Sequence, residues 1–278
     1  MLKLLKILTI LLSFLLLISC SSTIRQTNKN FKWPRDSFVK YEAWIIKQEC
    51  HPNEPNNLES ECYEKERGYT GSGSIIANGF DGSYILAAAH MCDQGEELKL
   101  LKKEDEKDKS SEGNIFFAKH FVRDLDDLRY NAEIVAYDID LDACIVFAWG
   151  LFKDSLAISK EDPKIGSKVF NIAAPAGFFK KNLVPLFDGF YIGKWDKYSS
   201  VYTIPAVGGS SGSPILNNRG ELIGLIYARH NRFHHIVISP DLKKLRKFIL
   251  ESVNKSAKER SRKHGLDLRR SIIIKFNN

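Results

Sequence analysis

A serine, a histidine and an aspartate stand in sequence contexts that suit nucleophilic catalysis. His90 ends the hydrophobic run ILAAAH, Asp142 precedes the apolar run ACIVFAW, and Ser211 lies in the Gly/Ser segment GGSSGSP. A serine hydroxyl is a weak nucleophile until an imidazole accepts its proton, and a carboxylate holds that imidazole in the useful tautomer. Each residue alone indicates only a structural side chain or a turn. Together they predict acyl transfer through a covalent intermediate.

The glycines around Ser211 fit the same chemistry. A tight Gly-rich turn can direct the backbone N–H groups of Gly209 and Ser211 toward one point, where they would stabilise a tetrahedral oxyanion. The absence of a side chain at Gly209 also leaves room for a substrate backbone.

Short β-type segments separated by turn residues make up most of the chain, which predicts an all-β protein. They fall into two units, a first β-barrel over 36–155 and a second over 156–240. Leucines at helical spacing after Asp241 predict a helix over 241–253, followed by a basic tail over 254–278. The charged stretch over 100–114 has no apolar face and predicts a solvated loop.

The segments ILAAAH, DACIV and GGSSGSPILNNRGELIGLIYA resemble the three signature segments of the trypsin-like serine proteases of the chymotrypsin fold. The similarity spans roughly 68–253, and the G-x-S-G-S-P segment is similar to that of exported bacterial glutamyl endopeptidases. The resemblance implies two packed antiparallel six-stranded β-barrels with a C-terminal helix, and a catalytic cleft between the barrels. It makes His90 the general base, Asp142 its partner, Ser211 the nucleophile, and Gly209 with Ser211 the oxyanion hole. It implies no metal and no organic cofactor.

Neighbouring residues compete for two of these roles. The family pattern puts the aspartate directly before an apolar-small-apolar run, which favours Asp142. The nucleophile has Gly two residues before it and Gly-Ser-Pro after it, which favours Ser211. The other candidates for the aspartate are Asp138 and Asp140, of which Asp140 is the second choice. The other candidates for the nucleophile are Ser210 and Ser213.

The resemblance also places a primary specificity pocket. No acidic residue is available there to bind a Lys or Arg side chain, whereas Arg229 and His230 would favour an acidic substrate residue; the alternative is two exposed polar residues at a strand end. Tyr227 stands where many relatives have a small serine that supports the aspartate. The implied pocket residues are Pro205, Ala206, Tyr227, Ala228 and Arg229.

The first 20 residues have the regions of a secretory signal peptide: two lysines, an apolar run and small residues at the end. The run is short for a membrane span, which needs about 20 residues, although an uncleaved anchor is the alternative. Leu17-Ile18-Ser19-Cys20 fits the bacterial lipoprotein cleavage box, with lipidation at Cys20 and a flexible tether over 21–35. We therefore expect an exported protein of the cell envelope, held at the membrane by its lipidated N-terminus and otherwise periplasmic or secreted.

Four cysteines remain beyond Cys20, and they allow three pairings in an oxidising compartment. The turn-rich segment between Cys50 and Cys62 favours a local bridge. Cys144 lies within an apolar run, so we expect a buried free thiol there.

The net charge of +7 is confined to one end of the chain, because residues 241–278 carry twelve basic and four acidic side chains. The rest of the chain is mildly acidic, and the tail lacks the aromatic residues that interleave with basic ones in single-strand binding, so no nucleic-acid partner is expected. The basic tail is expected to contact anionic phospholipid.

The sequence predicts an exported serine endopeptidase that hydrolyses peptide bonds in protein or peptide substrates through an acyl-enzyme. The alternative is a catalytically inactive trypsin-like domain that binds envelope proteins or peptides. With 44% hydrophobic and 27% charged residues, the composition excludes a wholly disordered chain and a polytopic membrane protein.

Overall fold

The computed structural model describes residues 31–51, 61–105, 115–264 and 273–275. Residues 32–278 form one compact unit, and residues 1–31 belong to another. The predicted signal peptide, Cys20 and most of the predicted tether therefore lie outside the described residues. No helix in the described ranges is long and apolar enough to cross a membrane.

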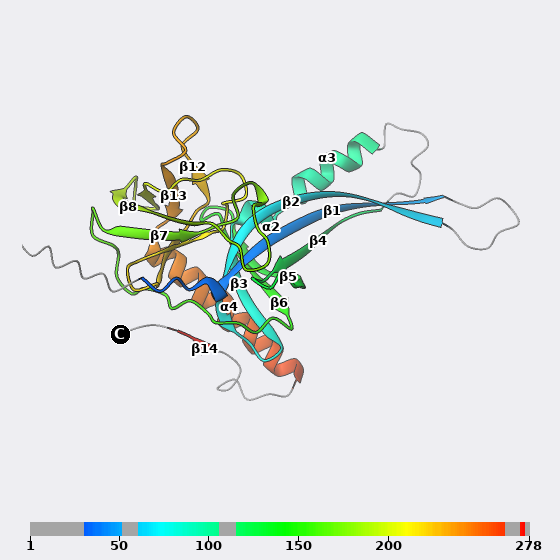
Figure 1. The fold of residues 1–278 in the computed structure, drawn as a ribbon. Helices are drawn as coiled ribbons and strands as arrows, with labels where there is room; N and C mark the ends of the chain where they lie inside the picture. Colours follow the sequence, from blue (N-terminus) through cyan, green and yellow to red (C-terminus); the bar gives the residue numbers. More distant parts are fainter. Residues whose placement is uncertain (1–30, 52–60, 106–114, 265–272, 276–278) are drawn as a thin grey trace, which may run out of the picture. The chain divides into compact units, whose positions relative to one another are not determined.

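Six antiparallel strands close into a barrel in the order β1-β4-β5-β6-β3-β2, with β2 pairing back onto β1 (Figure 1). Every side chain of β3, and all but the last of β6, is buried. One face of these strands points into the barrel and the other is covered by packed elements, which explains their continuous apolar runs. A 3-10 turn, η1 (Arg35–Ser37), precedes the barrel. Its strands are β1 (Phe38–His51), β2 (Glu61–Asn78), β3 (Gly82–Ala87), β4 (Ile115–Arg123), β5 (Arg129–Asp138) and β6 (Ala143–Trp149).

The hairpin of β1 and β2 runs outward beyond the rest of the barrel (Figure 1). Its pairing continues to His51 and Glu61, whereas β4 accompanies β1 only as far as Gln48. Helix α3 (Gly95–Asp105) precedes β4 in the chain and buries none of its residues. The predicted loop over 100–114 was therefore wrong up to Asp105, because a helix without a buried apolar face leaves no periodic signal.

A second, seven-stranded sheet follows in the order β11-β10-β7-β8-β9-β13-β12. It is not closed in the described part of the chain, so the prediction of a second closed six-stranded barrel was wrong. Where β11 approaches β13, the N–H of Leu225 donates to the hydroxyl of Ser239 (3.0 Å) instead of to a ladder carbonyl. Gly224 admits that hydroxyl, since a Cβ there would lie 2.3 Å from it. The elements are β7 (Lys168–Ile172), the turn η2 (Pro175–Gly177), β8 (Leu186–Lys194), β9 (Ser199–Tyr202), β10 (Pro214–Leu216), β11 (Leu222–Leu225), β12 (Ala228–Arg229) and β13 (Val237–Pro240).

Helix α4 (Leu242–His264) packs against β5, β6 and β11. It begins where the sequence predicted, because the carboxylate of Asp241 accepts the N–H groups of Lys243 (3.1 Å) and Lys244 (3.3 Å). Its buried apolar side chains recur at three- and four-residue spacing: Leu242, Leu245, Ile249, Val253 and Ala257.

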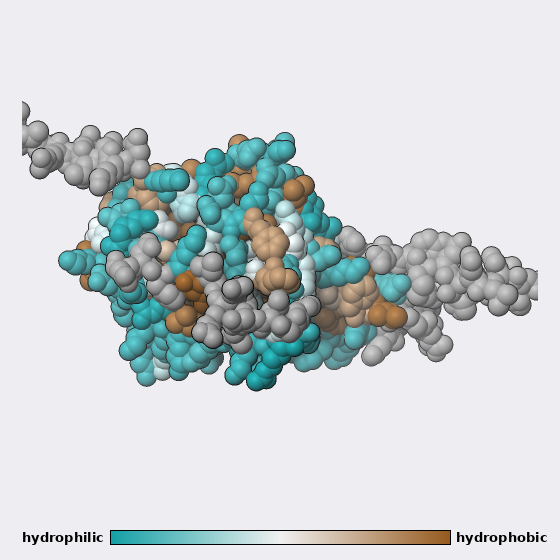
Figure 2. Space-filling view, turned by 90° about the horizontal axis from the view of Figure 1, so that it is seen from below, coloured by the Kyte–Doolittle hydropathy of each residue, from teal (hydrophilic) through white to brown (hydrophobic). Residues whose placement is uncertain are grey.

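Helix α4 extends well past residue 253, so part of the predicted basic tail is helical. Its last turns bury Ser256 and Ser261, and the guanidinium of Arg260 lies 3.8 Å from the ring centroid of Phe147 and 4.5 Å from that of Trp149. Near the chain end, β14 (Ile273–Ile274) pairs with β2. The face seen from below is mainly hydrophilic, with hydrophobic residues in small groups (Figure 2).

Candidate active site

His90 is held at the surface by buried neighbours. Strand β3 runs through buried alanines into the four-residue helix α2 (Ala89–Cys92), of which all residues except His90 are buried. Small residues at Ala88 and Ala89 let this segment pack closely against the barrel. The apolar positions thus fix the direction in which the imidazole projects.

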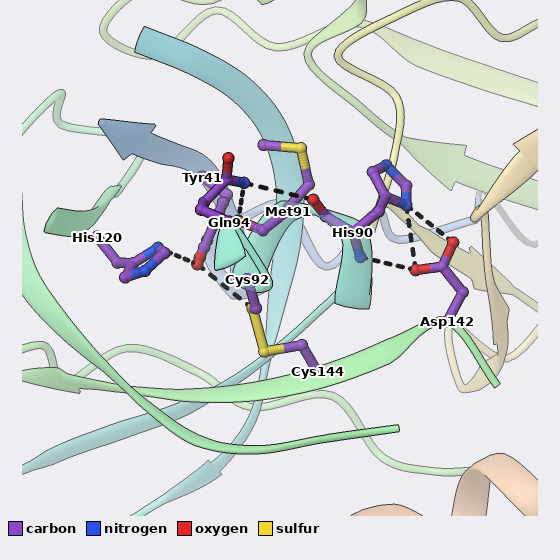
Figure 3. Close-up of a disulfide and its surroundings, with 8 residues drawn as sticks. All are labelled: Tyr41, His90, Met91, Cys92, Gln94, His120, Asp142 and Cys144. Atoms are coloured by element: carbon purple, nitrogen blue, oxygen red, sulfur yellow. Dashed lines mark hydrogen bonds and ion pairs between the residues drawn. A yellow bond between two sulfur atoms is a disulfide. The ribbon is translucent and has the colours of Figure 1, made fainter. Parts of the chain in front are cut away.

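Asp142 faces His90 from the turn between β5 and β6. One carboxylate oxygen lies 2.8 Å from Nδ1 of His90, and the other lies 3.1 Å from Nδ1 and accepts the backbone N–H of His90 at 2.9 Å (Figure 3). Asp142 has φ +45°, a left-handed conformation that few non-glycine residues adopt. The carboxylate therefore fixes both the ring and the backbone of His90, and it leaves Nε2 free for another partner.

The two competing aspartates have other surroundings. Asp138 accepts the N–H of Leu141 (3.0 Å) and so stabilises the turn. Asp140 is exposed and lines a separate pocket with Tyr198 and Lys244. Of the three aspartates, Asp142 is the one that the structure brings to His90.

Ser211 lies on a loop that packs against the segment carrying His90. Its carbonyl oxygen accepts the N–H of Ser72 (2.8 Å), and the next N–H, of Gly212, donates to Ile226 (2.7 Å). A Cβ on Gly212 would lie 2.2 Å from the carbonyl oxygen of Ser72 and 2.9 Å from the nitrogen of Ala88. Only glycine allows this approach, which brings the serine loop to the start of α2.

The neighbouring serines are occupied by the fold. Ser210 is 1% exposed and its hydroxyl accepts the N–H of Val207 (3.3 Å), while the fully buried Ser213 accepts the side-chain amide of Asn171 (2.8 Å). Ser211 is partly exposed, and its hydroxyl has no hydrogen-bond partner within the described ranges. It is therefore the hydroxyl available for chemistry.

The backbone N–H groups of Gly209 and Ser211 have no acceptor among the described residues. The carbonyl of Gly208 accepts the N–H of Ala176 (2.5 Å), and that of Ser210 accepts the N–H of Ser213 (3.0 Å). In a trans peptide the N–H points away from the C=O, so the N–H groups of Gly209 and Ser211 point away from these partners. Neither donates to an acceptor in the part of the chain that the structure describes. Both remain able to bind a developing negative charge.

Ser72 and Asn171 hold this loop, and we did not predict them from the sequence. The hydroxyl of Ser72 accepts the N–H of Ala174 (2.9 Å) and donates to the carbonyl of Gly209 (2.8 Å). The side-chain amide of Asn171 donates to Ser213 and to the carbonyl of Pro214 (2.9 Å). Both side chains are fully buried. The sequence carried a signal for Asn171, a polar residue within the apolar run of β7, but none for Ser72, which lies among the polar and small residues of β2.

The predicted pocket residues lie on adjoining segments of the second sheet. Pro205 and Ala206 precede the serine loop, and the N–H of Ala206 donates to the carbonyl of His234 (2.9 Å). Ala228 and Arg229 form β12, where Arg229 pairs with the fully buried Val237 of β13. The Nη1 atom of Arg229 is buried and has no acceptor within the described ranges.

The Tyr227 hydroxyl lies 3.4 Å from that of Ser199. Its hydrogen-bond partner is therefore a β9 serine, and within the described ranges it makes no hydrogen bond with Asp142. Tyr227 therefore does not orient the aspartate. Asp142 is held by its hydrogen bonds to His90 and by the bond from its own N–H to the carbonyl of Ile139.

A disulfide joins Cys92 and Cys144 next to this site (Figure 3). The expectation of a free thiol at Cys144 was therefore wrong. Cys50 and Cys62 are partners in the β1–β2 register, but their side chains lie outside what the structure describes, so the predicted local bridge stays a prediction.

The fold has counterparts among solved structures. One is the crystal structure of a serine endoprotease from Yersinia pestis, with a TM-score of 0.54 and 16% identity over 80% of this chain and 65% of that chain. At this identity the likeness shows the fold, and the chain spans about 65% of that protease's length. No curated protein is a detectable relative by sequence.

The sequence model of the trypsin-like peptidase domain matches residues 71–225, which is more than half of the chain. That range contains His90, Asp142 and Ser211. On this match, the chain belongs to the trypsin-like peptidases.

Proposed function

We propose that the protein is a serine endopeptidase in which Ser211 is the nucleophile, His90 the general base and Asp142 the group that orients the base. The observation that carries the proposal is the Asp142 carboxylate against Nδ1 of His90, beside a loop on which Ser211 has the free hydroxyl. A base and its orienter in this arrangement are what an unactivated serine needs.

The reaction follows from these positions. As Oγ of Ser211 attacks the scissile carbonyl, Nε2 of His90 accepts its proton, while Asp142 keeps the Nδ1–H tautomer and stabilises the imidazolium. The N–H groups of Gly209 and Ser211 stabilise the oxyanion. His90 then protonates the departing amine, and a water molecule, deprotonated by His90, hydrolyses the acyl-enzyme.

The substrate preference we propose is for an acidic side chain next to the scissile bond, as in the glutamyl-endopeptidase type. The buried Nη1 atom of Arg229 has no acceptor among the described residues, and a substrate carboxylate would supply one. Residues 228–240, which form β12, β13 and their connection, contain two arginines, three histidines and no acidic residue. Cleavage rates of matched peptides with Glu or Lys before the scissile bond test this preference; equal rates, or a Glu preference unchanged in R229A, would contradict it.

The proposed location is the cell envelope after export, with Cys20 as the lipidated N-terminus and the basic residues near the chain end against anionic phospholipid. The N-terminal sequence supports export. Mass spectrometry of the protein from bacterial membranes would show a diacylglyceryl Cys20; an intact N-terminus would contradict the lipoprotein assignment.

Labelling with a fluorophosphonate tests the catalytic assignment. The chain from residue 21 should be labelled at Ser211, located by peptide mass spectrometry, and S211A should not be labelled. S210A is the matched control, because it changes the adjacent serine and should keep the label. Absence of Ser211-dependent labelling in folded protein would refute the proposal and favour an inactive binding domain.

A further inference from the structure

The disulfide and the His90–Asp142 contact join the same two segments. Cys92 follows His90 by two residues in α2, and Cys144 follows Asp142 by two residues at the start of β6. Figure 3 shows the two links side by side, one through the sulfurs and one through the imidazole and carboxylate. A displacement of α2 relative to β6 would therefore change the geometry of both.

The strand ladder does not reach the catalytic pair. The pairing of β3 with β6 ends at Ala87 and Cys144, so His90 and Asp142 lie beyond its last rung. Past that point the chain continues as a helix of four residues with no side-chain N-cap, and as a turn with Asp142 at positive φ. So short a helix has little stability of its own. The disulfide is a covalent link where the backbone hydrogen bonds between these strands stop.

The two cysteines of the disulfide are buried. Cys92 is 2% exposed and Cys144 is fully buried. The Tyr41 hydroxyl lies 3.4 Å from Sγ of Cys92 and 2.8 Å from Nδ1 of His120. Burial raises the pKa of Tyr41 and lowers that of His120, so both are neutral near pH 7. Two free thiols need more space than a bonded pair, and a shift of α2 away from β6 would supply it.

We propose that the Cys92–Cys144 disulfide is the positioning element of the His90–Asp142 pair, and that its loss lowers turnover by loosening that pair. The inference rests on the proposed function. Reduction has the same effect: an added dithiol closes to a cyclic disulfide, and its two electrons and two protons convert Cys92 and Cys144 to thiols. Activity is therefore expected to require the oxidised form, as exported proteins normally have.

The double variant C92A/C144A tests this without leaving a lone thiol. We expect kcat to fall about 100-fold, as misplacement of a catalytic group by about 1 Å can cause, while KM stays within about twofold because the substrate-binding segments are untouched. The downfield proton NMR signal of the hydrogen bond between Nδ1 of His90 and Asp142, assigned with ¹⁵N-labelled histidine, should broaden or vanish.

L245A is the matched control. It truncates a fully buried side chain of α4, away from the pair, and should lower the melting temperature of the protein. At a temperature where both variants are folded, L245A should keep kcat and the NMR signal. If C92A/C144A does not fold, C92A/C144V, which restores apolar volume, takes its place.

The outcomes separate two failures. Wild-type kcat and an unchanged NMR signal in the disulfide-free variant would overturn the positioning role, and so would an equal loss of kcat in L245A. If the wild-type protein cleaves no peptide, the proposed function fails, but the NMR signal still decides whether the disulfide holds His90 against Asp142.

Discussion

The hydroxyl of Ser72 donates a 2.8 Å hydrogen bond to the carbonyl of Gly209, and so links β2 of the barrel to the loop that carries Ser211. The same hydroxyl accepts the N–H of Ala174. One buried side chain thus fixes the two loops of the second sheet that meet beside the free N–H of Gly209.

The variant S72A should lose about 1–3 kcal/mol of unfolding free energy, because the buried N–H of Ala174 loses its acceptor. It should also lower kcat, since the Gly209 peptide loses the bond that orients it. S74A is the matched control: Ser74 is fully buried in the same strand, but its hydroxyl has no partner within the described ranges. Urea denaturation and peptide cleavage measure the two effects; equal results for S72A and S74A would show that the bond has no role.

The variant D142N should keep the fold and lose about 10⁴-fold in kcat, because an amide stabilises the wrong imidazole tautomer. D140N changes an exposed aspartate of the same turn and should leave kcat unchanged. The kcat values of D142N and D140N are compared by steady-state kinetics on a peptide that the wild-type protein cleaves. A large loss in D140N with none in D142N would mean that the aspartate is misassigned.

The variant G212A should destabilise the protein by about 3 kcal/mol and abolish labelling of Ser211. The added Cβ would overlap the carbonyl oxygen of Ser72, and alanine is strained at φ +84°. G208A provides the comparison in the same loop, because a Cβ there meets nothing within 4 Å. Thermal melting and fluorophosphonate labelling report the difference; a G212A protein as stable and reactive as G208A would contradict the close packing against α2.

The local sequence patterns around the proposed catalytic residues were informative because each residue's neighbours set its environment. Gly209 and Gly212 are needed for close backbone approaches that a side chain would prevent, and the alanines before His90 are buried. The two β units were visible for a similar reason, since buried strands carry uninterrupted apolar runs.

Features that depend on distant partners were not predictable. Cys92 and Cys144 are 52 residues apart, and the apolar run around Cys144 suits a thiol as well as a disulfide. The later turns of α4 bury only small or polar residues, such as Ser256 and Ala257. Their sequence therefore has no apolar periodicity, and we predicted a tail there instead of a helix. Closure of the second sheet depends on how β11 meets β13, which local sequence does not record.

The carboxylate of Glu42 offers a pH test of barrel stability. It is 4% exposed; burial alone would raise its pKa, but Lys40 (3.1 Å) and Arg123 (2.9 Å) hold the pKa below its usual value of 4.5. A carboxyl whose pKa is lowered by folding stabilises the protein above the unfolded-state pKa, and this contribution disappears as the pH falls through the folded-state pKa.

E42Q should therefore be about 2 kcal/mol less stable than wild type at pH 7, and the difference should shrink below about pH 4.5. Urea denaturation across this range measures it, with the exposed Glu96 replaced in E96Q as the control. A difference that stays constant with pH would show that the charge of Glu42 does not stabilise the barrel.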